Sequence, residues 1–154
     1  MGLFDFLFGR QVKFQDSIIG ELTTKVKKDN PSINYTWTGS TKLTGQLKET
    51  FFILEGNNHG PYKDQLNSVH RIVDTLNDII ASVDREIKGM QNVKPRYMRD
   101  WTKEYHLAMV SPYDPNVKGV GKKFEVNFEP LDEKDLDYIG LIWDNGKLIE
   151  IKPY

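Results

Sequence analysis

The chain has 154 residues, a formal charge of −1 and no cysteine. This length fits a single domain, residues 1–154, with a core that needs no covalent staple. Without cysteine the chain has no disulfide and no thiolate metal site, which suits the reducing cytoplasm. The small net charge gives no overall field for nucleic acid or an anionic membrane, and no apolar run approaches the roughly 20 residues of a membrane-spanning helix.

The first ten residues form a short apolar segment, whose large side chains are Leu3, Phe4, Phe6, Leu7 and Phe8. It has neither the basic start nor the cleavage site of a signal peptide, and the myristoylation pattern fails because Phe6 stands where Ser or Thr is needed. Two interpretations remain open: a helix that packs on the domain, and an apolar tip that contacts a membrane or a partner. We favour packing, since five exposed apolar side chains would be an aggregation liability, and we expect no stable membrane anchoring.

Residues 12–55 have the alternation and the turn signals of an antiparallel meander. Turn residues occur at 29–31, where Asp, Asn and Pro follow one another, and at Thr44-Gly45. The strands expected around these turns are 12–14, 18–26, 35–43 and 47–55.

One long amphipathic segment covers residues 61–90. Apolar side chains recur there in alternating steps of three and four, at Leu66, Val69, Val73, Leu76, Ile80, Val83, Ile87 and Met90, and Ile72 and Ile79 widen the stripe. Pro61 suits the first position of a helix because the N–H that it lacks would be unpaired there, and Gly89 suits the end. The period predicts one helix over about 61–90 that packs across one face of a sheet.

A polar connection over 91–103 leads to a second group of strands, expected at 105–110, 123–128, 138–143 and 147–151. Asn145-Gly146, between the last two, is the strongest hairpin signal in the chain, because both residues of a type I′ turn need positive φ. The whole pattern predicts an α+β fold, in which an antiparallel meander sheet from both halves is covered on one face by the long helix.

No motif in the chain supplies a catalytic constellation. The histidines His59, His70 and His106 have no metal-site spacing on one helix, and residues 119–123 lack the spacer and the helix of a phosphate-binding loop. The basic and aromatic residues of 94–103 are interpreted as a returning loop rather than a nucleic-acid surface. We predict no catalytic residue, no cofactor and no metal. An enzyme with a composite site of His59, His106 and a distant carboxylate is a less favoured alternative.

Charge is unevenly distributed along the chain. Residues 124–154 hold three lysines and eight acidic residues, and within nine residues lie Glu129, Asp132, Glu133, Asp135 and Asp137. One interpretation of this acidic cluster is a solvated turn. The other is a docking surface for a basic protein partner, where such charge would act mainly on the association rate and the selectivity.

Short motifs within residues 12–90 carry a resemblance to a known group of proteins. They are Phe14-x-Asp16-x-x-x-Gly20-x-Leu22, then Tyr35-x-Trp37-x-Gly39, followed by a strand and a helix led by Gln65. This succession resembles small bacterial domain-of-unknown-function proteins, some of which are immunity-type proteins of polymorphic toxin systems. The resemblance implies a non-catalytic protein that neutralises a toxin domain by occlusion, and it carries over no catalytic residue. Together with the acidic cluster, it predicts that the five acidic residues bind a partner.

A self-associating structural or scaffold protein is the alternative hypothesis. The apolar stripe of residues 61–90 could pair with its twin in a homodimer, although Ile72 and Ile79 make it broader than a coiled-coil seam. Light scattering at high protein concentration tests this alternative, because a pairing stripe would give a dimer.

Overall fold

The computed structural model describes residues 9–89, 100–112, 123–132, 134, 138–144 and 147–153. These residues form a mixed α/β structure, in which a mostly antiparallel sheet of nine strands is accompanied by two helices and one short helical turn. The predicted apolar segment, up to residue 8, lies outside the described residues, as do residues 90–99 of the predicted helix end and polar connection.

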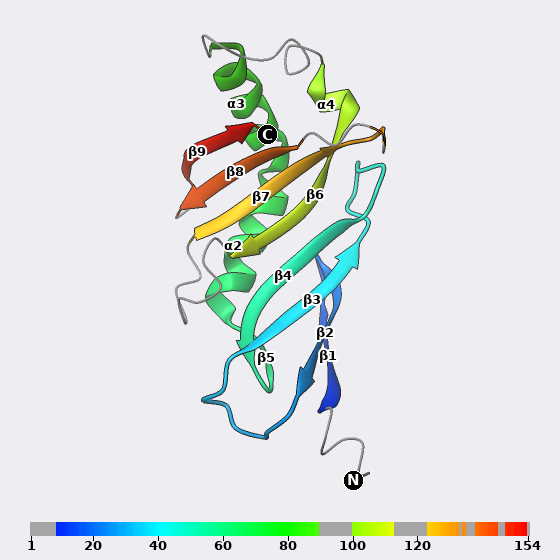
Figure 1. The fold of residues 1–154 in the computed structure, drawn as a ribbon, viewed down its shortest axis with the longest axis vertical. Helices are drawn as coiled ribbons and strands as arrows, with labels where there is room; N and C mark the ends of the chain where they lie inside the picture. The colour runs from blue at the N-terminus through cyan, green and yellow to red at the C-terminus, as the bar shows by residue number, and fades with distance from the viewer. Residues whose placement is uncertain are drawn as a thin grey trace.

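Two groups of strands build the sheet (Figure 1). The first is an antiparallel meander of β1 (Arg10–Asp16), β2 (Gly20–Val26), β3 (Tyr35–Thr41) and β4 (Thr50–Asn57), with the two-residue β5 (Gly60–Pro61) paired to the end of β4. The second is an antiparallel meander of β6 (Tyr105–Pro112), β7 (Lys123–Pro130), β8 (Ile139–Asp144) and β9 (Lys147–Pro153). All the predicted strands are therefore present, and β8 and β9 pair across the predicted Asn145-Gly146 turn, which itself lies outside the described residues.

One junction departs from the predicted antiparallel sheet, because β4 and β6 pair parallel, with Phe51 opposite Met109. Between these two strands the chain passes through the helices, and such a crossover brings it back in the same direction. Side chains reinforce this short pairing. The Thr50 hydroxyl donates to the Leu107 carbonyl oxygen at 2.8 Å, and the Leu107 N–H donates to Gln46 Oε1 at 2.9 Å.

Among the predicted strand boundaries that differ from the structure are the starts at Ile18 and at Leu47. Ile18 and Ile19 belong to the β1–β2 turn, because the Asp16 carboxylate accepts both of their backbone N–H groups, at 2.8 and 3.0 Å. Gly20 then has a φ of 78°, which glycine adopts without steric cost. Leu47 lies in the β3–β4 loop rather than in a strand.

The segment predicted as one helix consists of two, α2 (Lys63–Asp74) and α3 (Leu76–Gly89). Thr75 separates them, and its N–H and its hydroxyl both donate to the Arg71 carbonyl oxygen, at 3.0 and 2.8 Å. A side chain that bonds back to the preceding turn in this way disturbs the regular helical ladder. Pro61 does not begin the helix, because it pairs with Gly56 in β5. The sequence period thus predicts the helical segment but neither its first residue nor its interruption.

Both helices lie on one side of the sheet, behind it in the view of Figure 1. Their buried side chains join one core cluster with those of the strands; the members include Val69, Ile72, Ile79, Val83 and Ile87 with Leu22, Trp37, Phe52, Val110, Val126 and Phe128. Val73 and Ile80 are only partly buried, so the centre of the stripe lies on Ile72 and Ile79. Because the chain's own core buries this stripe, a homodimer would have to use another surface.

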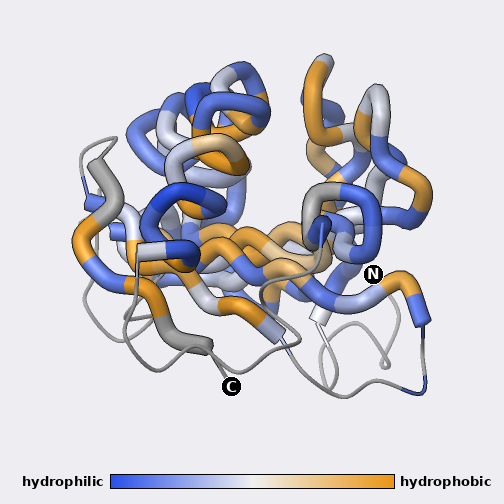
Figure 2. Tube along the Cα trace, turned by 90° about the horizontal axis from the view of Figure 1, so that it is seen from above, coloured by the Kyte–Doolittle hydropathy of each residue, from blue (hydrophilic) through white to orange (hydrophobic). Residues whose placement is uncertain are grey.

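The β1–β2 hairpin curls toward the same side of the sheet as the helices (Figure 2). Phe14 of β1 packs edge-on against Trp37, with ring centroids 6.2 Å apart. Its ring also lies against Gly60, where an added Cβ would come within 2.8 Å of it. The hairpin is therefore held close to the start of α2, and this arrangement brings Asp16 to His70. At the other end of the sheet, a short helical turn, α4 (Trp101–Glu104), precedes β6.

Candidate functional site

The predicted acidic surface lies at the end of β7 as far as the structure describes it. Glu129 and Asp132 are both exposed, and Asp132 Oδ1 accepts the backbone N–H of Lys134 at 3.1 Å. Glu133, Asp135 and Asp137 lie outside the described residues. Glu129 is opposite His106 of β6 in the sheet register. Two of the five predicted partner-binding side chains are therefore available to solvent at the start of the predicted cluster.

His106 is buried beside this acidic end, with 7% of its surface exposed. Burial lowers the pKa of its imidazole and so does the nearby Lys48, although the Leu107 carbonyl and Glu129 act in the opposite direction. The ring is therefore mainly neutral at pH 7. The same electrostatic effects show that Lys48 of the β3–β4 loop and Glu129 of β7 both lie near His106.

The structure does not bring His59 and His106 together. His59 is exposed in the turn between β4 and β5, where its N–H donates to Asn57 Oδ1. His106 lies near the opposite end of the parallel β4–β6 pair. At about 3.3 Å per strand residue, the two histidines are roughly 25 Å apart. Within the described residues no group of three or more His, Asp or Glu side chains is placed to hold a metal ion.

His70 forms a pair with Asp16 that no signal in the sequence predicts. Its Nε2 lies 3.0 Å from both carboxylate oxygens of Asp16, across 54 residues of sequence. Asp16 also accepts the amides of Ile18 and Ile19, so one carboxylate joins β1, the following turn and α2. In the described part of the chain no hydroxyl is hydrogen-bonded to the His70 ring, whose partner is the Asp16 carboxylate.

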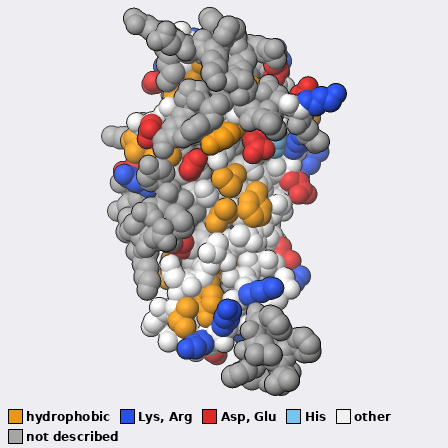
Figure 3. All heavy atoms as spheres, viewed as in Figure 1, with side chains coloured by type: hydrophobic (Ala, Val, Ile, Leu, Met, Phe, Trp, Pro, Cys, Tyr) orange, Lys and Arg blue, Asp and Glu red, His pale blue; other side chains and the backbone are white. Residues whose placement is uncertain are grey.

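The sheet face opposite the helices carries an apolar patch with acidic neighbours. Phe51 and Met109 lie side by side on this face, because their neighbours Phe52 and Val110 point into the core. Phe51 is 39% exposed, and Leu47, in the adjoining loop, is 69% exposed. Figure 3 shows hydrophobic side chains in the middle of this face with acidic ones near them, and basic ones toward the β1–β2 end. We call Leu47, Phe51, Met109, Glu129 and Asp132 the apolar–acidic patch.

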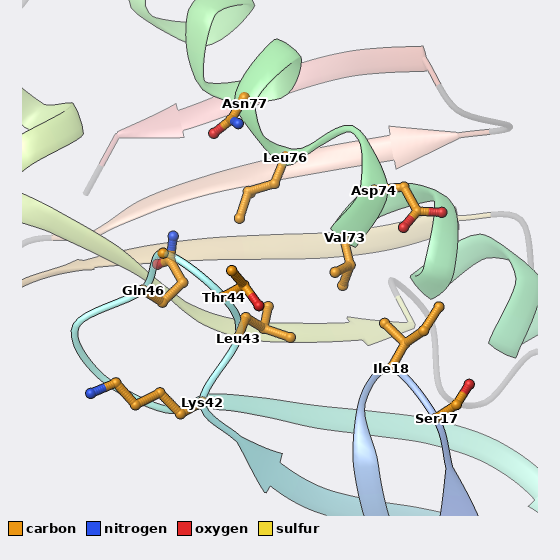
Figure 4. A pocket seen from close by; sticks show the side chains of 11 residues that line it. Ser17, Ile18, Lys42, Leu43, Thr44, Gln46, Val73, Asp74, Leu76 and Asn77 are labelled. Atoms are coloured by element: carbon orange, nitrogen blue, oxygen red, sulfur yellow. The ribbon is translucent and has the colours of Figure 1, made fainter.

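A separate cleft of about 600 Å³ opens at the junction of α2 and α3 (Figure 4). Its walls are the β1–β2 turn, the β3–β4 loop and the helix residues on either side of Thr75. Aliphatic side chains from all three walls approach one another there, namely Ile18, Leu43, Val73 and Leu76. No sequence motif marks this cleft, because it forms only when three distant segments meet.

Comparison of the chain with protein-family models, curated proteins and solved structures finds no match. None of the described helices combines the length and the apolar character that crossing a membrane requires. The assignment of function therefore depends on the geometry of the patch, together with the resemblance seen in the sequence.

Proposed function

We propose that this chain is a non-catalytic protein-binding protein of the bacterial cytoplasm, and that it neutralises a basic toxin domain by occlusion, as immunity-type proteins do. The observation that carries the proposal is the apolar–acidic patch, in which exposed Phe51 lies beside Met109 and exposed Glu129 lies on the same sheet face, two residues along β7 from Asn127, the partner of Met109. The resemblance of residues 12–90 to small bacterial domain-of-unknown-function proteins, some of which are immunity-type proteins, supports it as well, and so does the acidic cluster that begins at Glu129.

The composition of the patch fits a protein partner better than a small ligand. A few side chains that become fully desolvated on contact supply most of the binding energy at protein interfaces. Acidic side chains at the edge of such a contact remain partly hydrated, so they raise the association rate and select partners of opposite charge. Phe51 would therefore anchor the partner, and Glu129 and Asp132 would attract its basic surface.

The β3–β4 loop is held in place at this patch, which favours binding. Gln46 Oε1 accepts the Leu107 N–H, and the Gln46 N–H donates to the Leu43 carbonyl oxygen at 3.1 Å. Leu47 follows directly and points away from the core. Because the loop is already ordered, a partner that buries Leu47 has less conformational entropy to remove.

Binding of the native partner by two variants tests the proposal. The partner is first captured from the native host on the immobilised chain and identified, and its affinity is then measured with purified protein. We expect Phe51→Asp to weaken binding at least about tenfold, because it places a charge in the buried centre of the contact. Its control is Thr36→Asp, on the same sheet face at an exposed position of β3 outside the patch.

The charges are tested by the double variant Glu129→Lys, Asp132→Lys, with Glu86→Lys on the exposed side of α3 as control. We expect slower association for the double variant and a weaker dependence of the rate on salt. A partner that binds both patch variants as tightly as the wild-type chain would exclude the patch as its binding surface. A captured partner whose toxic activity persists at equimolar chain would exclude neutralisation.

A further inference from the structure

We propose that the cleft at the junction of α2 and α3 binds a small uncharged molecule that has an aliphatic body and a polar end of the amide type. This inference goes beyond the proposed function and does not depend on it, because the cleft and the apolar–acidic patch share no residue. The volume of about 600 Å³ lies in the range of small-molecule sites.

The floor of the cleft is aliphatic. Figure 4 shows Ile18, Leu43 and Val73 directed toward the space between their three segments. Leu43 is buried, whereas Ile18 and Val73 are only partly buried and still face the cleft. Water against such side chains is displaced favourably by an apolar group. The absence of an aromatic ring from the lining favours an alkyl chain over a flat ring system that would stack.

The rim is polar and nearly balanced in charge. Ser17 and Thr44 contribute hydroxyls and Asn77 an amide, so the rim offers hydrogen-bond donors and acceptors together. Its charged members are one lysine, Lys42, and one aspartate, Asp74, both exposed to solvent. These opposite charges give no net preference for an anion or a cation. A primary amide, which both donates and accepts, complements this rim.

The three walls are held in place by hydrogen bonds. Asp16 fixes the Ile18 end of the β1–β2 turn, and Gln46 fixes the β3–β4 loop to Leu107. On the helix side, Thr75 bonds back to Arg71. At Gly45, in the loop wall, no atom lies within 4 Å of the position of an added Cβ, so space is open there. A cleft with fixed walls binds without a large ordering cost.

The test is a titration of the full chain followed by ¹H–¹⁵N correlation spectra, with hexanamide as the probe. We expect saturable shifts at the amides of residues 17–18, 42–46 and 73–77. Hexanoate and hexylamine, which have the same alkyl chain and a charged end, should bind more weakly. If hexanamide gives no saturable shift at these amides, the site is disproved. Equal or tighter binding of either charged probe would overturn the assignment of an uncharged ligand.

A matched pair of variants places the probe in the cleft. Thr44→Trp at the exposed rim should weaken hexanamide binding roughly tenfold or more by filling the opening, whereas Thr36→Trp, exposed on β3, should not change it. Phe51→Asp should also leave probe binding unchanged, which separates this proposal from the proposed partner surface. Equal loss in the Thr44→Trp and Thr36→Trp proteins would mean that the probe binds elsewhere, and the proposal would fail.

Discussion

Asp16 shows how one side chain can hold three parts of this fold. Its carboxylate accepts the amides of Ile18 and Ile19 and pairs with His70 Nε2. Burial acts to raise the pKa of Asp16, but the two amides and His70 outweigh this effect, so the pKa of the folded chain lies below the ordinary value of 3.8. The sequence shows Asp16 within a short motif and His70 beside the apolar stripe, but nothing local relates the two residues.

The contribution of Asp16 to stability should depend on pH. Because its pKa is lower in the folded than in the unfolded chain, its stabilisation is complete above the unfolded value and is lost as the pH falls through the folded value. We expect Asp16→Asn to lower the free energy of unfolding by about 1.5–3 kcal/mol at pH 7, and the deficit to shrink below about pH 4. Urea unfolding at a series of pH values measures both.

Glu86→Gln, at an exposed position of α3, is the control for the Asp16 experiment and should change the free energy of unfolding by less than about 0.5 kcal/mol. A deficit of Asp16→Asn that stays constant down to pH 2 would mean that hydrogen-bond geometry, rather than the charge of Asp16, is responsible.

At the scale of elements, the helical segment was predictable and its interruption was not. The stripe from Leu66 to Ile87 repeats at the helical period, and most of its side chains are buried. Thr75 carries no breaking signal of the kind that proline or glycine gives. Its hydroxyl donates to the Arg71 carbonyl oxygen, which also accepts the helical N–H of Thr75, and such a side-chain bond to the preceding turn often bends a helix. Residues on either side of the interruption line the cleft, namely Val73, Asp74, Leu76 and Asn77. A sequence pattern that predicts one straight helix therefore cannot predict the cleft.

Thr75→Ala tests whether the side chain causes the interruption. Alanine removes the hydroxyl that bonds to Arg71 and has the higher helix propensity, so we expect the free energy of unfolding to rise by about 0.5 kcal/mol. Backbone ¹³C shifts at residues 74–76 should move toward helical values. Thr75→Ser keeps the hydroxyl and should keep the interruption. Unchanged shifts in Thr75→Ala would instead assign the interruption to packing of the two helices on the sheet.

At the scale of the whole molecule, the sheet depends on a junction between two meanders. Within each meander, alternation and turn residues are local signals, which is why the strands could be predicted from the sequence. The pairing of β4 with β6 depends on the crossover through α2 and α3, and only two pairs of residues are in register there. The Thr50 hydroxyl and the Gln46 side chain add bonds to Leu107 across this junction. The apolar–acidic patch spans the junction, since it takes residues from both meanders.

The junction and the shared core predict that the two meanders unfold together, as one domain. Trp37 is buried in the first meander and Trp143 is partly buried in the second. The chain has a third tryptophan, Trp101. We therefore consider two proteins, one that keeps only Trp37 and one that keeps only Trp143, with the remaining tryptophans changed to phenylalanine. Each protein reports on one meander. In each protein the fluorescence and far-UV circular dichroism midpoints in urea should coincide.

Thr50→Val should then lower the free energy of unfolding reported by Trp37 and by Trp143 to the same extent, by about 1 kcal/mol, because it removes a buried hydrogen bond at the junction. A control substitution, Thr36→Val, lies on the exposed face of β3 away from the junction and should have little effect. Separate midpoints, or a loss that one tryptophan reports and the other does not, would divide the chain into two units. In that event a partner bound across the patch would itself hold the two meanders together, and its binding would raise the stability of both.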